Sequence, residues 1–96
     1  HLPNGPGVYY FNDIKEKVIY VGKAINIRKR VSSHFTHNDP DKKRQHLLRS
    51  ISSITYKECA TELEAIVLES TEIKRLWPKY NYSQKKKKNH ASPVQL

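Results

Sequence analysis

Hydrophobic and polar positions alternate over two short stretches near the start of the chain. In 8–11 the side chains point alternately to two faces, and Tyr9 shares its face with Phe11. A second run, 18–21, is built from β-branched and aromatic residues, which favour a pleated surface. The polar segment between the two runs is turn-prone, so the pattern predicts an antiparallel hairpin. This pairing brings Tyr9 near Tyr20, where the default interpretation is a packed aromatic pair.

The period then changes to that of a helix. Asn26 is the expected N-cap, and apolar side chains recur every four residues after it at Ile27, Val31 and Phe35. Arg30 and His34 run along one border of this stripe. Two interpretations of these residues remain open: they are solvated edge residues, or they are the cations of an anion-binding site beside the preceding strand.

A second helical pattern covers 42–54, with apolar positions at Leu47, Leu48, Ile51 and Ile54. Its basic start is expected to face solvent, and consists of Lys42, Lys43 and Arg44. Alternation resumes in 53–59, which predicts a third strand at an edge of the sheet.

The third helix is predicted over 61–77, because Thr61 and Glu64 form a capping box and Pro78 follows the last apolar residue. Its inward positions are expected to be Leu63, Ile66, Val67, Ile73, Leu76 and Trp77. At about 100° per residue, Glu69 falls inside this arc, whereas Glu64 and Glu72 fall outside it. A buried carboxylate is costly unless it is paired. Glu69 is therefore either a structural salt-bridge partner of Arg30 or Lys23, or a metal ligand.

Length and charge limit the possibilities further. Ninety-six residues make one small domain, expected over 1–82, with a basic tail over 83–96 that includes the run Lys85 to Lys88. Ten of the 18 Lys and Arg residues fall between Lys15 and Arg49, so we expect a polyanion partner. A single cysteine, Cys59, excludes an internal disulfide, and its spacing from His34, His37 and His46 matches no common zinc pattern.

No apolar run is long enough to span a membrane and no signal peptide is visible, so we expect a cytoplasmic protein without a membrane partner. The abrupt start at His1 predicts a domain taken from a longer chain. We expect the isolated domain to be a monomer.

Several motifs occur in a fixed order along the chain. They are Gly7-Val8-Tyr9, Tyr20-Val21-Gly22-Lys23-Ala24, Arg30, Ser32-Ser33-His34-Phe35, Thr61-Glu62-Leu63-Glu64-Ala65, Glu69 and Pro78-Lys79-Tyr80-Asn81. Together they resemble the GIY-YIG nuclease family over about residues 5–82. Within that family the chain is most similar to the N-terminal incision domain of UvrC-type subunits of nucleotide-excision repair, which is also found fused to exonuclease domains of the DNA polymerase III epsilon type.

The resemblance implies an α+β fold, a small antiparallel three-stranded sheet flanked by helices, and a metal-dependent DNA endonuclease. It also implies roles. Tyr20 is the general base or water-orienting phenol, and Tyr9 is its neighbour. Gly22 lets substrate approach, and Lys23 and Arg30 contact the scissile phosphate. Glu69 binds one Mg²⁺ or Mn²⁺ ion, and Asn81 orders the site.

Two departures from the family pattern stand out. His34 replaces a usual tyrosine and is expected to act as a hydrogen-bonding or proton-shuttling group. The interval from Tyr9 to Tyr20 is one residue longer than in close relatives, which a longer hairpin turn is expected to absorb. The alternative functions are a catalytically silent nucleic-acid-binding module and, more weakly, an RNA-associated basic domain, for which no RNA-type stacking motif is visible.

Overall fold

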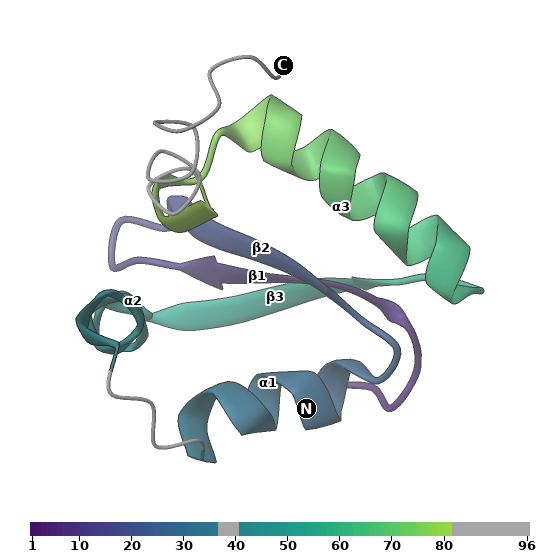
Figure 1. Ribbon diagram of the computed structural model, residues 1–96, viewed down its shortest axis with the longest axis horizontal. Helices are drawn as coiled ribbons and strands as arrows, with labels where there is room; N and C mark the ends of the chain where they lie inside the picture. Colours follow the sequence, from purple (N-terminus) through teal and green to yellow (C-terminus); the bar gives the residue numbers. More distant parts are fainter. Residues whose placement is uncertain (37–40, 82–96) are drawn as a thin grey trace.

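The fold is a three-stranded antiparallel sheet with helices on both faces. The computed structural model describes residues 1–36 and 41–81 of the chain. The elements are, in order, β1 (Gly7–Asn12), β2 (Val18–Ala24), α1 (Ile27–Thr36), α2 (Lys42–Ser50), β3 (Ser53–Glu58) and α3 (Glu62–Leu76). The strand order is β2-β1-β3, so β2 and β3 are the edges. Figure 1 shows α1 below the sheet and α3 above it. The predicted α+β class and the antiparallel sheet are confirmed.

The predicted hairpin of β1 and β2 places the two tyrosines together. Tyr9 pairs with Gly22 and Phe11 pairs with Tyr20, so Tyr9 and Tyr20 share one face of the sheet. Their ring centroids are 6.3 Å apart. The register shifts after Phe11, where Ile19 is the extra residue of a β-bulge in β2. The strand β2 therefore contains one residue more than the part of β1 that it pairs with. Because the bulge lies beyond the Phe11–Tyr20 pair, Tyr9 and Tyr20 remain on the same face of the sheet.

Helix α1 begins as predicted, but its buried face differs from the prediction at one position. Asn26 Oδ1 accepts the backbone N–H of Lys29 at 3.0 Å, which is the expected N-cap. The buried residues are Ile27, Val31 and His34, whereas Phe35 is 50% exposed. The prediction that Phe35 is part of the buried stripe is wrong, and His34 takes the position facing the sheet. Burial of this polar ring is possible because both of its nitrogens have partners, as described below.

Helix α2 is shorter than predicted. It ends at Ser50 instead of continuing to Ile54, because the chain turns there to join the sheet and Ser52 N–H donates to the carbonyl of Asn12 at 2.7 Å. Ile54 lies in β3, which is an edge strand as predicted.

Helix α3 presents an unexpected face to the sheet. The capping box is confirmed, since Thr61 Oγ1 accepts the backbone N–H of Glu64 at 3.1 Å. The buried residues of α3, however, are Ala65 and Glu72. The inward positions predicted from hydrophobicity are wrong in four of six cases, because these side chains are exposed: Leu63, Ile66, Val67 and Trp77.

Two features explain this orientation. Ala65 is fully buried and small, so the helix approaches the sheet closely. Glu72 is 4% exposed and was predicted outside the buried arc. Its carboxylate accepts hydrogen bonds from the Tyr10 hydroxyl at 2.8 Å and from the Arg75 guanidinium at 2.8 and 2.9 Å. These partners satisfy a buried charge that the apolar pattern alone would place in water.

Among the helices of the described segments, none combines the length and the apolar character needed to cross a bilayer. Two features of the sequence lie outside the described residues: His37 and the lysine run Lys85–Lys88.

Candidate active site

The centre of the site is the Tyr9 hydroxyl, which lies directly over Gly22 of the edge strand β2. A Cβ atom added to Gly22 would lie 2.3 Å from both Cζ and Oη of Tyr9, far inside contact distance. Gly22 does not have a positive φ angle, so its backbone conformation does not require glycine. Glycine is needed because a side chain here would overlap with Tyr9. The structure therefore gives Gly22 a role beside the expected approach of substrate: it leaves room for the Tyr9 phenol.

Tyr9 is joined to α1 through His34. Tyr9 Oη and His34 Nε2 are 2.8 Å apart, and both residues are almost completely buried. Burial raises the pKa of Tyr9 above its ordinary value of 10.0; the charge of a Tyr20 phenolate raises it further, and Arg30 lowers it. Tyr9 is therefore a neutral phenol at physiological pH.

His34 is held from its other side by α2. The Nη2 atom of Arg44 lies 2.6 Å from His34 Nδ1. Burial lowers the pKa of His34 to about 4, and the positive charges of Arg44 and Arg30 act in the same direction. The expectation that Arg44 stays in solvent is wrong. No sequence signal points to this contact, because an arginine in the basic first turn of a helix looks the same whether it faces water or a buried ring.

Tyr20 lies beside this pair, at the open edge of the sheet. It is half-buried, and burial is the main cause that raises its pKa above 10.0. Arg30 and Arg44 lower the pKa, as does the neighbouring Tyr9 hydroxyl, whereas Glu69 raises it. The cations that lower the pKa of Tyr20 are thus two arginines, one from α1 and one from α2.

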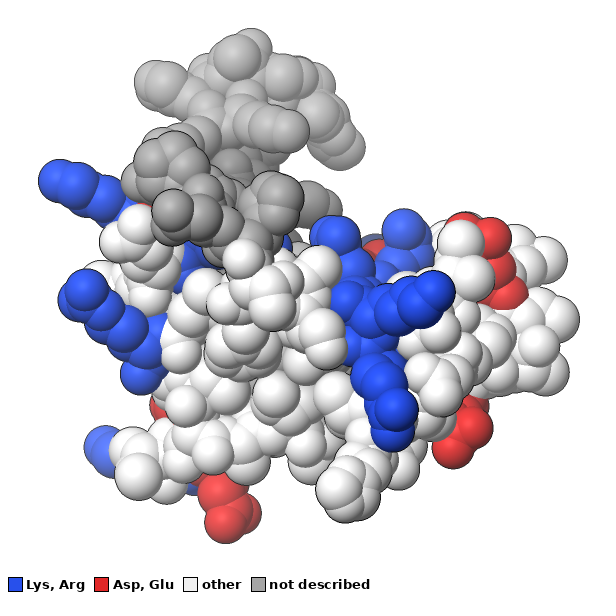
Figure 2. Space-filling view, turned by 90° about the horizontal axis from the view of Figure 1, so that it is seen from below, with Lys and Arg blue, Asp and Glu red and all other residues white. Residues whose placement is uncertain are grey.

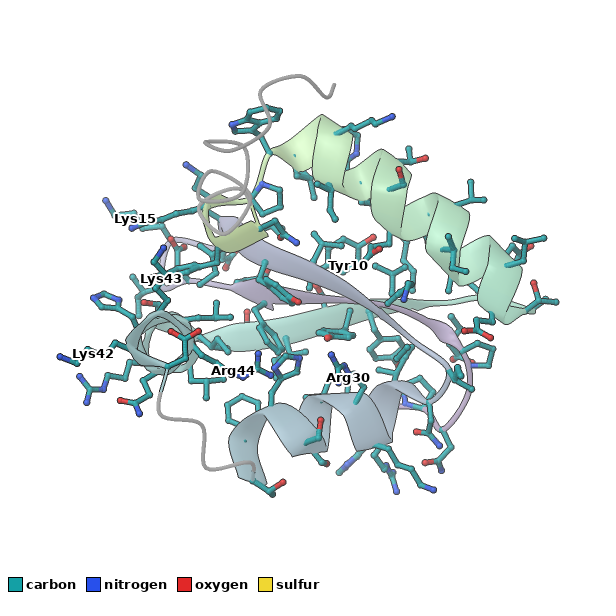
Figure 3. All side chains as sticks on the ribbon, viewed as in Figure 1. Tyr10, Lys15, Arg30, Lys42, Lys43 and Arg44 are labelled. Atoms are coloured by element: carbon teal, nitrogen blue, oxygen red, sulfur yellow. The ribbon has the colours of Figure 1, made fainter. Side chains whose placement is uncertain are left out.

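Arg30 and Lys23 border a cleft at the end of β2 where the chain enters α1. Arg30 is exposed on α1, and Figure 3 shows its side chain on the side of α1 that faces the sheet. The cleft has a volume of about 380 Å³, and neither tyrosine is part of its lining, which has three cations, one carboxylate and four uncharged residues: Lys23, Lys29, Arg30, Glu62, Ala24, Ile25, Asn26 and Ala65. On the α1 side of the molecule, Lys and Arg side chains gather in a compact group (Figure 2). Such a group favours an anionic ligand.

Glu69 approaches the tyrosines from α3. It is half-buried and lies on the same helical face as the buried Ala65 and Glu72, four residues after the first and three before the second. Its charge acts on both Tyr9 and Tyr20. Within residues 1–36 and 41–81 its carboxylate has no hydrogen bond and no ion pair, so the salt bridge to Arg30 or Lys23 that we considered is not formed there.

This environment fits a divalent cation. A partly buried carboxylate without a protein cation is unfavourable by itself, and a metal ion at its oxygens removes that penalty. Mg²⁺ keeps several of its waters and needs as few as one or two protein carboxylates. In the described part of the chain no group of three or more His, Cys, Asp or Glu side chains could hold a metal. The single carboxylate of Glu69 could hold such a hydrated ion.

Asn81 fixes the backbone of β2 between Tyr20 and Gly22. Its Oδ1 accepts the backbone N–H of Val21 at 2.9 Å, and its Nδ2 donates to the carbonyl of Val21 at 3.1 Å. Asn81 is placed there by one helical turn at 79–81, which follows Trp77 in the left-handed conformation and the buried Pro78. The side-chain amide pairs with the free edge of β2 as a neighbouring strand would.

The structure brings the sequence-predicted site residues into one region around the edge strand. The chain as a whole is similar to known proteins over most of its length. Residues 5–82 match the model of the UvrC-like GIY-YIG domain. The UvrABC system protein C of Methanococcus maripaludis is 43% identical over 90 residues, and that of Porphyromonas gingivalis is 45% identical over 93 residues. These matches cover 94% and 97% of this chain but 17% and 16% of the relatives, so the chain spans about a sixth of their length.

A solved structure is similar over most of both chains. It is the GIY-YIG N-terminal endonuclease domain of UvrC from Thermotoga maritima, bound to its catalytic divalent cation, magnesium. The two chains share 33% sequence identity with a TM-score of 0.73, and the match covers 82% of this chain and 85% of the other.

Proposed function

This chain belongs to the UvrC-like GIY-YIG domain family, and from this premise we propose that it is a divalent-metal-dependent endonuclease domain that hydrolyses a phosphodiester bond of DNA. The observation that carries the proposal is that Arg30 and Glu69 both act on the phenol of Tyr20, while the Glu69 carboxylate has no ion pair among residues 1–36 and 41–81. A module that only binds DNA has no need of a carboxylate, which repels phosphates.

In the proposed reaction, Tyr20 accepts the proton of the attacking water. The new bond joins the water oxygen to phosphorus, the bond from phosphorus to the leaving oxygen breaks, and that oxygen takes a proton from solvent. Tyr20 must be ionised to act in this way, and Arg30 and Arg44 favour its phenolate form. Tyr9 and His34 position the phenol from behind.

Arg30 and Lys23 are proposed to bind the phosphate. The planar guanidinium of Arg30 can contact two phosphate oxygens at once, which a lysine in the same position cannot do. Glu69 is proposed to hold one Mg²⁺ or Mn²⁺ ion, whose charge, when it is bound, offsets the negative charge that develops on the phosphate. Asn81 keeps the strand that carries Tyr20 and Gly22 in register with these groups.

The wider context is also proposed from the relatives. Because the chain spans about a sixth of the UvrC proteins that it matches, we infer that the domain acts within a longer chain in DNA repair. The recognition of a lesion or of a particular DNA structure then belongs to the remainder of that chain.

The test is nicking of supercoiled plasmid by the purified domain with Mg²⁺ or Mn²⁺, beside a reaction with chelator. We expect conversion to open circles in the presence of metal and none with chelator. The control is the Tyr20→Phe/Glu69→Gln double variant, purified in the same way, which reveals any contaminating nuclease. Tight binding of DNA without metal-dependent nicking would support the silent binding module instead.

A further inference from the structure

Arg44 makes a contact that determines which nitrogen of His34 carries the proton. Its guanidinium has only N–H donors and no acceptor. The 2.6 Å contact from Arg44 Nη2 to His34 Nδ1 is therefore a hydrogen bond in which Nδ1 accepts. Figure 3 shows Arg44 and Arg30 both between α1 and the sheet, so this contact lies inside the fold.

The single ring proton of His34 must then lie on Nε2. His34 is completely buried, and burial together with Arg44 and Arg30 lowers its pKa to about 4, so the ring is neutral at pH 7. With Nδ1 unprotonated, Nε2–H donates to the Tyr9 oxygen at 2.8 Å. His34 is accordingly a donor to Tyr9 and does not accept its proton.

The direction of these bonds continues to Tyr20. Because the Tyr9 oxygen accepts from His34, its own O–H is available to donate in another direction. The Tyr9 and Tyr20 rings share one face of the sheet, with centroids 6.3 Å apart, and the Tyr9 hydroxyl favours the phenolate form of Tyr20. The observed donors thus run from Arg44 to His34 and from His34 to Tyr9, which leaves the Tyr9 O–H free to point toward Tyr20.

We propose that Arg44 is a positioning residue that sets the direction of this hydrogen-bond chain, so that the chain ends as a donor to the Tyr20 oxygen. The inference rests on the proposed function, in which Tyr20 accepts the proton of water. Without Arg44 the imidazole can adopt the other tautomer, Nε2 then accepts the Tyr9 proton, and Tyr9 no longer donates to Tyr20. The remaining charged groups that act on the two phenols are Arg30 of α1 and Glu69 of α3.

The first test follows the proton by NMR, without DNA and without metal. In ¹⁵N-histidine-labelled protein at pH 7, the His34 ring should show the Nε2–H tautomer in the parent, with the signal assigned by its absence from His34→Gln. In Arg44→Met the ring should change to a mixture or to the Nδ1–H tautomer. An Nδ1–H tautomer in the parent itself overturns the proposal, whatever the variants do.

The second test measures the phenol at the end of the chain. In protein labelled with ¹³C at tyrosine Cζ, the Tyr20 signal is assigned by its absence from Tyr20→Phe and titrated with pH. Arg44→Met should raise the apparent pKa of Tyr20 relative to the parent, because both the Arg44 charge and the direction of the chain are lost. Arg44→Lys should recover part of the difference because it keeps the charge and a donor, so the His34 tautomer decides how much of the shift belongs to the chain. Lys42→Met is the matched control, since it removes one charge from the same turn of α2 without touching His34.

Single-turnover cleavage at saturating protein then connects the proton to the reaction. The acidic limb of the rate–pH profile, where the rate rises as Tyr20 ionises, should move to higher pH in Arg44→Met by the same interval as the Tyr20 pKa. At any pH on that limb the rate should fall about tenfold for every pH unit by which the limb moves. Lys42→Met should keep the parent profile. If Arg44→Met unfolds, Arg44→Lys and the tautomer of the parent still decide the question.

The outcomes separate the inference from the proposed function. A parent that never cleaves DNA refutes the function, whereas the NMR tests still judge the hydrogen-bond chain. A folded Arg44→Met protein that has the parent's His34 tautomer and the parent's Tyr20 titration refutes the role of Arg44. A changed tautomer with an unchanged rate–pH profile in an active enzyme also refutes it, because the chain then has no effect on the reaction.

Discussion

The tight contact between Gly22 and Tyr9 yields a sharp prediction for Gly22→Ala. The new methyl group would lie 2.3 Å from Tyr9 Cζ and Oη, while ordinary van der Waals contact begins at 3.4 Å. The methyl group is attached to the backbone of β2, which is held by its pairing with β1. The phenol of Tyr9 must therefore be the group that moves, by about 1 Å. A movement of this size is large enough to take the 2.8 Å contact with His34 beyond hydrogen-bonding distance.

Two consequences of different size follow. Inserting a methyl group into a packed site costs about 1–3 kcal/mol of the free energy of unfolding. In a domain of this length each kcal/mol corresponds to roughly 4–8 °C in the melting temperature. Misplacing a positioning group by about 1 Å can lower the rate by about 10²-fold. Gly22→Ala should therefore lose more in single-turnover cleavage than its moderate loss of stability explains.

The assay combines thermal unfolding by circular dichroism with single-turnover nicking well below the melting temperature. Gly5→Ala is the matched control, because no atom lies within 4 Å of a Cβ placed there and its φ angle is not positive. Removing the ring with Tyr9→Ala should abolish the stability cost of adding Gly22→Ala, which tests the clash itself in a double-mutant cycle. A Gly22→Ala protein with the stability and rate of the parent would refute this reasoning.

Three further predictions concern other residues and the basic surface. Glu69→Gln should abolish metal-dependent nicking while DNA binding is kept or tightened; parent-like nicking in Mg²⁺ would show that Glu69 is not the ligand. Tyr20→Phe should keep the fold and lower the single-turnover rate by about 10²–10⁴-fold, and an unchanged rate would return Tyr20 to a packing role. DNA affinity should fall steeply with salt, with a log–log slope of roughly −0.9 for each phosphate neutralised, and a salt-independent dissociation constant would remove the electrostatic argument.

The pattern of the sequence predicts the elements of the fold well and their buried faces less well. The hairpin, the edge strand β3 and the caps at Asn26 and Thr61 follow from local rules, because turns and caps depend on neighbouring residues. The face of α3 does not follow from hydrophobicity. Its burial of Glu72 depends on Tyr10 in β1, which is 62 residues away in the sequence and has no periodic signal.

Some residues of the candidate site could be proposed from the sequence, and others could not. The residues of the sequence motifs were proposed from the chain alone, and Glu69 was proposed because a carboxylate at that position of the helix is costly without a partner; their roles stay predictions. Arg44 was missed, since its importance arises from contact with the buried ring of His34 after α1 and α2 are packed. A basic helix start normally faces water, so the pattern correctly predicted the common case and failed for one residue.

The candidate site lies at an edge strand, where backbone N–H and C=O groups have no neighbouring strand to pair with. β2 has a free edge, which exposes backbone groups that can pair with another chain. Covering that edge with a fourth strand would protect it but would close the site. Asn81 instead satisfies the N–H and the carbonyl of Val21 with one side chain, so the strand is fixed at the point between Tyr20 and Gly22.

The edge consequently stays open where a substrate must enter. Because α1 and α3 cover opposite faces of the sheet, the cation of Arg30 and the carboxylate of Glu69 can act on the same phenols there, and they do so from opposite sides of β2 (Figure 1). If this reasoning is correct, Asn81→Leu should lose order in β2 before the rest of the sheet. Hydrogen exchange of the Val21 amide should then accelerate relative to that of Tyr10 in the central strand β1, whereas equal acceleration of both amides would indicate global destabilisation instead.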